Sequence, residues 1–197
     1  MPERPRARAG ATNAATTITI NRAPVLTLWA AVVAERLGYD RDEAVTLGRA
    51  VAGLNAAAKA RSLDIAKPRE KPAVERRAKP PRAGESVEVA LCNRIVPVVQ
   101  TPDGLRATAE GKPTAPANVH RYLESKFGDA LPTVREAMSA LAKSRPKEQL
   151  AAKAFALYEA FRPAIPGGVR GWGAKGVLDL ALIRSLATKA RVAVARR

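Results

Sequence analysis

Residues 25–34 form the longest apolar stretch of this 197-residue chain, and only Thr27 interrupts it. The stretch is too short to cross a bilayer as a helix, because a crossing takes about 20 apolar residues. Val25, Trp29 and Val33 give the helix predicted here apolar surface on more than one side. We therefore expect this helix to be buried, either by a second domain of the same chain or by a partner.

The helix around this stretch is followed at once by a second one. Asn21 stands in the position of an N-cap, and Gly38 supplies the left-handed residue that ends a helix. Asp40 with Glu43 three residues later has the spacing of a capping box, which marks the next helix start. Residues 22–60 therefore predict two helices joined by a tight turn.

These two helices resemble the helix-turn-helix family of DNA-binding units. The resemblance covers about twenty residues and rests on the positions Ala34, Leu37, Gly38, Tyr39, Ala44 and Leu47. In that family the start of the second helix reads base edges in the major groove, which here implies Arg41, Asp42, Val45 and Thr46. Phosphates would repel the acids at this helix start, so an ordinary packed hairpin or a dimerisation element is the favoured alternative.

Positive charge is concentrated in three segments that are too polar or too rich in proline to pack. The chain has 34 Lys and Arg against 18 Asp and Glu, a net charge of +16. An N-terminal tail (1–16), a linker with four prolines (66–84) and a C-terminal tail (187–197) carry +11 of it in 46 residues. Flexible basic arms bind phosphates by releasing counterions. The alternative is that these segments are solvated and only keep the protein soluble.

Short strands and further helices are expected in the rest of the chain. The expected strands are 17–20 near the N-terminus and then 87–91, 94–99 and 105–109, and the expected helices are 116–127, 132–143, 146–161 and 178–187. Cys92 and Asn93 form the turn of a hairpin. Pro97 should place its strand at a sheet edge, or else it argues against a strand there, because proline has no N–H to donate.

The expected fold class is therefore mainly α (α+β). It comprises an N-terminal helical hairpin resembling a helix-turn-helix, a basic linker, and a C-terminal helical domain with a small antiparallel β-hairpin. The expected boundaries are a disordered basic tail 1–16, a helical hairpin domain 17–65, a basic Pro-rich linker 66–84, an α+β helical domain 85–186 and a basic tail 187–197.

A glycine-rich loop precedes the last predicted helix. Residues 171–176 match G-x-G-x-x-G, but no strand precedes them and no acid follows about twenty residues later, which excludes a dinucleotide site. Two interpretations of the loop 167–176 stay open. Its backbone N–H groups, with Arg170, Lys175 and the stacking face of Trp172, form an anion site. Alternatively, Trp172 is buried and pins a packing loop, which is the favoured interpretation.

The sequence offers little for catalysis. The single cysteine, Cys92, excludes an intramolecular disulfide, and the single histidine, His120, excludes a histidine cluster. Nothing orients these two residues as a nucleophile and its base. No G-x-S-x-G or H-E-x-x-H signature is present. We expect no enzyme activity, no catalytic residue, no cofactor and no metal.

The sequence therefore predicts a non-enzymatic nucleic-acid-binding protein, with DNA favoured, of the nucleoid-associated or transcription-regulator type. The alternatives are an RNA- or ribosome-associated binder and a protein–protein adaptor that docks through its helical hairpin. We expect a cytoplasmic protein of the bacterial nucleoid, without membrane contact, and a homodimer stays open. The expected contact residues are Lys67, Arg69, Lys71, Arg76, Arg77, Lys79, Arg82, Arg170, Trp172, Lys175, Arg184, Lys189, Arg191, Arg196 and Arg197.

Overall fold

Helices make up most of the computed structural model, which describes residues 16–62, 87–168 and 173–195. The helices are α1 (Arg22–Leu37), α2 (Arg41–Ser62), α3 (Pro116–Phe127), α4 (Leu131–Lys143), α5 (Lys147–Phe161) and α6 (Leu180–Ala195). The strands are β1 (Thr17–Asn21), β2 (Val87–Leu91), β3 (Arg94–Thr101), β4 (Gly104–Ala109), β5 (Lys112–Pro113) and β6 (Lys175–Asp179). The mainly α class with small antiparallel sheets is confirmed.

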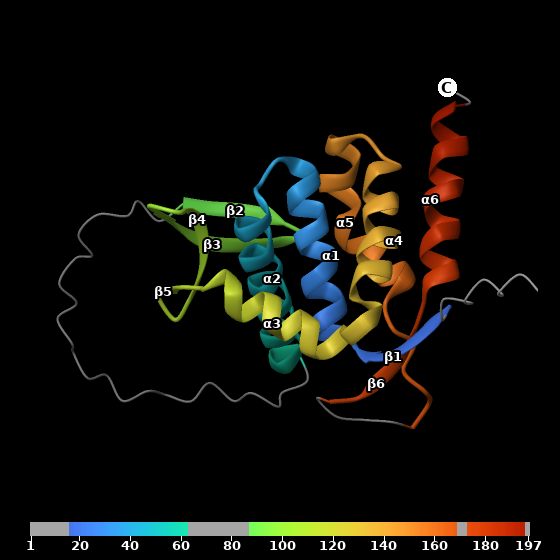
Figure 1. Cartoon of the computed structure of the whole chain (residues 1–197), viewed down its shortest axis with the longest axis horizontal. Coiled ribbons are helices and arrows are strands. Elements are labelled where there is room, and N and C mark those ends of the chain that lie inside the picture. The colour runs from blue at the N-terminus through green and yellow to red at the C-terminus, as the bar shows by residue number, and fades with distance from the viewer. Residues whose placement is uncertain (1–15, 63–86, 169–172, 196–197) are drawn as a thin grey trace, which may run out of the picture.

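Two antiparallel sheets lie at different ends of the helical body. β2, β3, β4 and β5 form one sheet in that order, and β1 pairs with β6 in the other. Figure 1 shows the four-stranded sheet beside α2, and α6 with the two-stranded sheet at the opposite side of the molecule. Cys92 and Asn93 form the turn between β2 and β3 with φ of 48° and 56°, as a two-residue hairpin turn requires.

Helix α1 is the central element of the fold. Every side chain from Pro24 to Ala34 is buried. The helix packs against α2 on one side and against α4 and α5 on the other (Figure 1). The expectation that this apolar helix must be covered is confirmed, and its cover comes from the same chain.

The two N-terminal helices approach each other closely at Gly48. A Cβ atom there would lie 2.3 Å from the carbonyl oxygen of Thr27 and 2.9 Å from the amide nitrogen of Ala31. Only a glycine permits this approach of two backbones. The predicted capping box is also confirmed, since the amide of Glu43 donates to Asp40 Oδ1 at 2.7 Å and the amide of Asp40 donates to Glu43 Oε2 at 3.2 Å.

Helix α2 is tied to the sheet by its first two turns. Glu43 Oε1 accepts a 2.7 Å hydrogen bond from the amide of Leu105, and the buried Thr46 hydroxyl accepts one of 3.2 Å from the amide of Ala107. One hydrophobic core includes side chains of α1 and α2 together with side chains of the strands and helices after residue 86. The expected boundary between 17–65 and 85–186 therefore does not separate two cores.

The C-terminal region differs from the expectation in two ways. The end of the expected loop 167–176 enters strand β6, which was not predicted and which pairs with β1. Helix α6 begins at Leu180, where Asp179 Oδ1 accepts from the amides of Ala181 and Leu182, and it continues to Ala195. Most of the expected tail 187–197 is thus helical. The buried residues Ile183, Ala187 and Ala190 recur at helical spacing, and α6 packs against α4.

The placement of Pro97 at a sheet edge was wrong. Pro97 lies in β3, which is an inner strand between β2 and β4. It stands opposite Glu88 of β2, whereas the pairing of β3 with β4 begins one residue later, at Val98 and Ala107. The proline is tolerated because it lies just beyond the end of one of the two ladders.

Candidate anion-binding pocket

An open pocket of about 590 Å³ lies between the start of α1, the second half of α2, the start of β3 and α5. Its lining combines basic, polar and aromatic side chains, and we call it the cationic pocket. It is lined by Asn21, Arg22, Ala23, Leu26, Ala52, Asn55, Ala56, Ala58, Lys59, Ser62, Arg94, Phe155, Tyr158, Glu159, Arg162, Ile165 and Ala174.

The facing walls of the cationic pocket are two helix faces. On α2, Asn55, Lys59 and Ser62 follow one another at spacings of four and three residues, with small alanines between them. On α5, Phe155, Tyr158 and Glu159 line the pocket at helical spacing, and Arg162 lines it just after the helix ends at Phe161. The alanines leave room between the walls, and the longer side chains surround that room.

Positive charge dominates the lining of the cationic pocket. Arg22, Lys59, Arg94 and Arg162 face a single acid among the lining residues, Glu159. Arg162 Nη1 donates to Glu159 Oε1 at 2.8 Å, so this acid is already engaged. Arg22, Lys59 and Arg94 have no carboxylate within ion-pair distance among the residues that the structure describes. Such a concave surface of one sign concentrates anions.

Arg22 is held at one end of the cationic pocket by two hydrogen bonds. Its Nε donates to the carbonyl oxygen of Pro163 at 3.1 Å, and the hydroxyl of Tyr158 donates to the carbonyl oxygen of Arg22 at 3.2 Å. Burial raises the pKa of Tyr158 to about 12, although the neighbouring Arg22 and Arg162 act in the opposite direction. The phenol therefore stays protonated at neutral pH and serves as a donor.

Arg94 reaches the cationic pocket from the start of β3. Its Nη2 donates to Asn55 Oδ1 at 2.9 Å, and its guanidinium carbon lies 6.0 Å from the centre of the Phe155 ring. The Nε atom is buried and has no acceptor in the part of the chain that the structure describes. A buried donor without an acceptor costs about 1–3 kcal/mol.

None of the expected contact residues that the structure describes lines the cationic pocket. Lys175 is exposed on β6, and Arg184 and Lys189 are exposed on α6. Arg191 belongs to α6, but its side chain is not described. The other expected contact residues lie outside the described ranges: Lys67, Arg69, Lys71, Arg76, Arg77, Lys79, Arg82, Arg170, Trp172, Arg196 and Arg197.

The end of the glycine-rich loop has a packing role. Gly176 is buried in β6, and a Cβ atom there would lie 2.7 Å from the carbonyl oxygen of Ala164. Ala164 and Val177 form an isolated antiparallel bridge at this point. Gly176 therefore lets the chain after α5 approach β6. Residues 169–172, on which the choice between an anion site and a packing loop depends, lie outside the described ranges.

Two of the four positions at the start of α2 that the helix-turn-helix resemblance implies are buried. Val45 is 2% exposed and Thr46 is fully buried against β4. Asp42 Oδ1 lies 3.2 Å from Nε2 of His120 on α3. These contacts match the alternative of a packed helical hairpin and leave two of the positions implied by the helix-turn-helix resemblance inside the core.

The only cysteine of the chain, Cys92, is buried, and the only histidine, His120, lies beside Asp42. Cys92 is 2% exposed, and burial raises the pKa of its thiol to about 12, so a thiolate is disfavoured. Within the described ranges, no cluster of three or more His, Cys, Asp or Glu side chains could hold a metal. Over the same residues, no helix combines the length and the apolarity that a bilayer crossing needs.

Comparison with known proteins gave no match to any protein-family model, any curated protein or any solved structure. The candidate site therefore depends on the geometry of this chain alone. The sequence interpretation missed Arg22, Lys59 and Arg94, because it looked for charge in segments that do not pack. The signal that could have found Lys59 is the polar spacing of Asn55, Lys59 and Ser62 within an alanine-rich helix.

Proposed function

We propose that the protein binds nucleic acid without catalysing a reaction, and that duplex DNA is its first ligand. The observation that supports this is positive charge left unneutralised in the folded part of the chain. The described residues hold 21 of the 34 Lys and Arg but only 13 of the 18 Asp and Glu, a net charge of +8.

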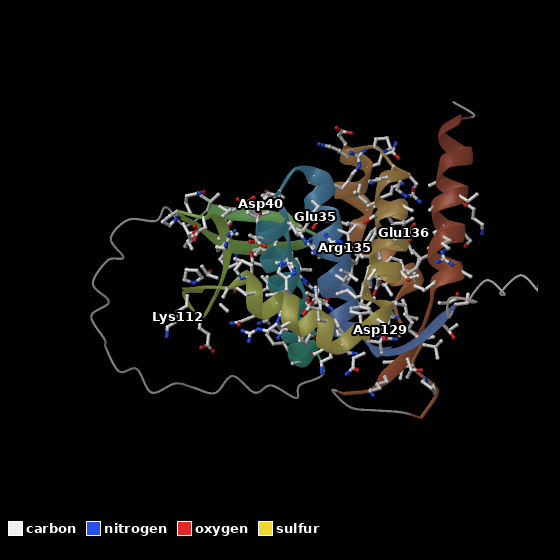
Figure 2. All side chains as sticks on the ribbon, viewed as in Figure 1. Glu35, Asp40, Lys112, Asp129, Arg135 and Glu136 are labelled. Carbon is white, nitrogen blue, oxygen red and sulfur yellow. The ribbon has the colours of Figure 1, made fainter. Side chains whose placement is uncertain are left out.

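Few of these cations are paired within the fold. Among the described residues, the Lys and Arg side chains make ion pairs with carboxylates only at Arg135 with Glu35 and at Arg162 with Glu159. Figure 2 shows Arg135 of α4 beside Glu35 near the end of α1. The remaining cations attract a polyanion over a long range, and phosphates are the polyanion charges that such side chains bind by releasing counterions.

The residues outside the described ranges add an equal excess of positive charge. Residues 1–15, 63–86, 169–172 and 196–197 together hold 13 Lys and Arg against five Asp and Glu, which is again +8. The expected contacts through 66–84 and the C-terminal end stay part of this proposal. The exposed cations of β6 and α6, namely Lys175, Arg184 and Lys189, extend it into the folded body.

The test is a titration of the full chain with a short fluorescent duplex DNA, followed by anisotropy between about 50 and 200 mM salt. Binding should weaken steeply with salt, because each tenfold rise in salt concentration lowers log K by about 0.9 per phosphate neutralised. Absence of binding at the low end of this range would overturn the proposal. Single-stranded RNA competitor that displaces the duplex at lower concentration than unlabelled duplex would overturn the preference for DNA.

A triple variant locates the contact on the folded body. Changing Lys175, Arg184 and Lys189 to Ser should reduce the salt slope by up to about 3, because each cation neutralises at most one phosphate. Thr188→Ser is the matched control, since Thr188 is exposed on α6 between two of these cations and carries no charge. An unchanged slope in the triple variant would place the contact elsewhere.

A further inference from the structure

We infer that the cationic pocket binds the terminal phosphate monoester of a nucleotide. This inference rests on the proposed function, since it names the part of a nucleic acid that this site holds. It differs from that proposal because a terminal group enters a concave pocket, whereas the sides of a duplex contact an exposed surface.

The size of the pocket favours a terminal group. Its volume of about 590 Å³ is within the range of about 300–1,000 Å³ that is typical of small-molecule sites. The walls come from α2 and α5, whose facing side chains surround the space. A continuous duplex backbone has no end to insert there, while a single nucleotide at a chain end has the right dimensions.

The charge of the pocket favours a monoester over a diester. A phosphate monoester carries about −1.5 to −2 at pH 7, and an internal phosphodiester carries about −1. Arg22, Lys59 and Arg94 are three cations without a carboxylate partner among the described residues, and Glu159 is already paired. Three cations around one diester would leave excess charge, whereas a monoester balances most of it.

The donors of the pocket suit phosphate oxygens. Arg94 lines the pocket and has a planar fork of donors, which matches phosphate geometry. The amide of Asn55 fixes the fork at 2.9 Å, so little side-chain entropy remains to be lost on binding. Lys59 is exposed at the rim and adds a mobile charge.

An aromatic wall of the pocket suits the nucleoside part of the proposed ligand. Phe155 is partly buried and lies beside Tyr158, with 5.9 Å between the ring centres. Base stacking on aromatic side chains is sequence-tolerant and contributes about 1–3 kcal/mol per base. The pocket therefore combines a phosphate end, formed by the three cations, with an apolar wall for a sugar or base.

The experiment titrates the full chain by calorimetry with inorganic phosphate, a nucleoside, and the same nucleoside as its 5′-monophosphate, at about 150 mM salt. The monophosphate should bind at least about tenfold more tightly than either inorganic phosphate or the nucleoside, because it engages both ends of the pocket. Equal affinities for the monophosphate and inorganic phosphate would overturn the nucleotide assignment. If neither the monophosphate nor inorganic phosphate binds, the assignment of the pocket as a phosphate site is overturned.

Two oligonucleotides then compare the free nucleotide with a chain end. A single strand with a 5′-phosphate should bind about tenfold more tightly than the same strand with a 5′-hydroxyl group. Lys59→Glu should abolish this difference without affecting the fold, because the Lys59 side chain is exposed and makes no ion pair with any residue that the structure describes. Lys153→Glu, an exposed lysine of α5 outside the pocket, is the matched charge control and should keep the difference.

The outcomes separate the two proposals. Duplex binding without any preference for the phosphorylated end overturns the pocket inference and leaves the proposed function standing. Monophosphate binding that is sensitive to Lys59→Glu, without any duplex binding at low salt, supports the pocket and overturns the duplex proposal. Arg94→Gln provides a second variant, and an unchanged monophosphate affinity in both variants overturns the pocket even if binding is observed.

Discussion

The indole Nε1 of Trp29 donates a 2.8 Å hydrogen bond to the backbone carbonyl oxygen of Ala154. This bond joins the centre of α1 to the centre of α5 across 125 positions of the chain. The same indole meets the ring of Phe161 edge-on, with 5.2 Å between the ring centres. Helix α5 forms one wall of the cationic pocket, so the buried contacts of Trp29 fix the position of that wall.

Trp29→Phe should lower the free energy of unfolding by about 1–3 kcal/mol, because it removes a buried hydrogen bond and leaves unfilled volume. Urea unfolding followed by circular dichroism measures this change. Phe155→Leu is the control, since that ring is only partly buried and is not part of the Trp29 contact. A loss below about 0.5 kcal/mol for Trp29→Phe would show that the α1–α5 contact contributes little.

Two glycines of α2 should respond to alanine in opposite ways. Gly48→Ala should destabilise the protein by about 3 kcal/mol, because the new Cβ meets two backbone atoms of α1 within 3 Å and the helices must separate. Gly53→Ala should stabilise it by about 0.5–1 kcal/mol, because no atom lies within 4 Å of the new Cβ and alanine favours a helix. Thermal unfolding of both variants tests the pair. Equal effects would contradict the close approach at Gly48.

Glu43→Ala should cost about 1–3 kcal/mol of stability, since the carboxylate accepts from the amides of both Asp40 and Leu105. Glu43→Gln keeps one oxygen that can accept a hydrogen bond, so this variant should lose less stability than Glu43→Ala. Glu136→Ala is the control, because Glu136 is exposed on α4 (Figure 2) and makes no ion pair within the described ranges. If Glu43→Ala and Glu136→Ala unfold at the same urea concentration, the link between the helix start and the sheet is not stabilising.

The free energy of unfolding should fall as pH rises above 9. Burial raises the pKa of Cys92 from 9.0 to about 12, so the folded chain holds a proton there that the unfolded chain has lost. The unfolded state therefore binds fewer protons in this window, and stability declines with pH. Tyr158 adds to the decline between pH 10 and about 12. Urea unfolding across this range should give a shallower decline for Cys92→Ala than for the unaltered chain, and an identical decline would contradict the assignment.

Local sequence signals predicted most helices and the hairpin, because their patterns lie within a few residues. The apolar run 25–34, the capping box at Asp40 and the glycine at Gly38 act at short range, and each matches the structure. Strand β6 was not predicted because its partner β1 begins 158 residues earlier in the chain. In this antiparallel pair, Thr17 is opposite Asp179. A five-residue strand beside glycines carries no pattern that indicates such a partner.

The cationic pocket could not be predicted for a similar reason. The sequence shows that Asn55 and Lys59 share a face of α2 and that Phe155 and Glu159 share a face of α5. It does not show that these two faces meet, because their relation depends on how both helices pack against α1. The basic charge of the sequence is densest in stretches rich in proline and arginine, whereas Arg94 is an isolated cation that follows a hairpin turn.

The pairing of β1 with β6 affects how the chain is completed during synthesis. Thr17 is opposite Asp179, and the amide of Leu180 donates to the carbonyl oxygen of Thr16 at 2.8 Å. At about 5–20 residues per second, the ribosome needs roughly 8–30 seconds between making the first of these strands and the second. During that interval the residues of β1 lack the strand with which they pair in the folded chain, so this sheet can form only after nearly the whole chain has been made.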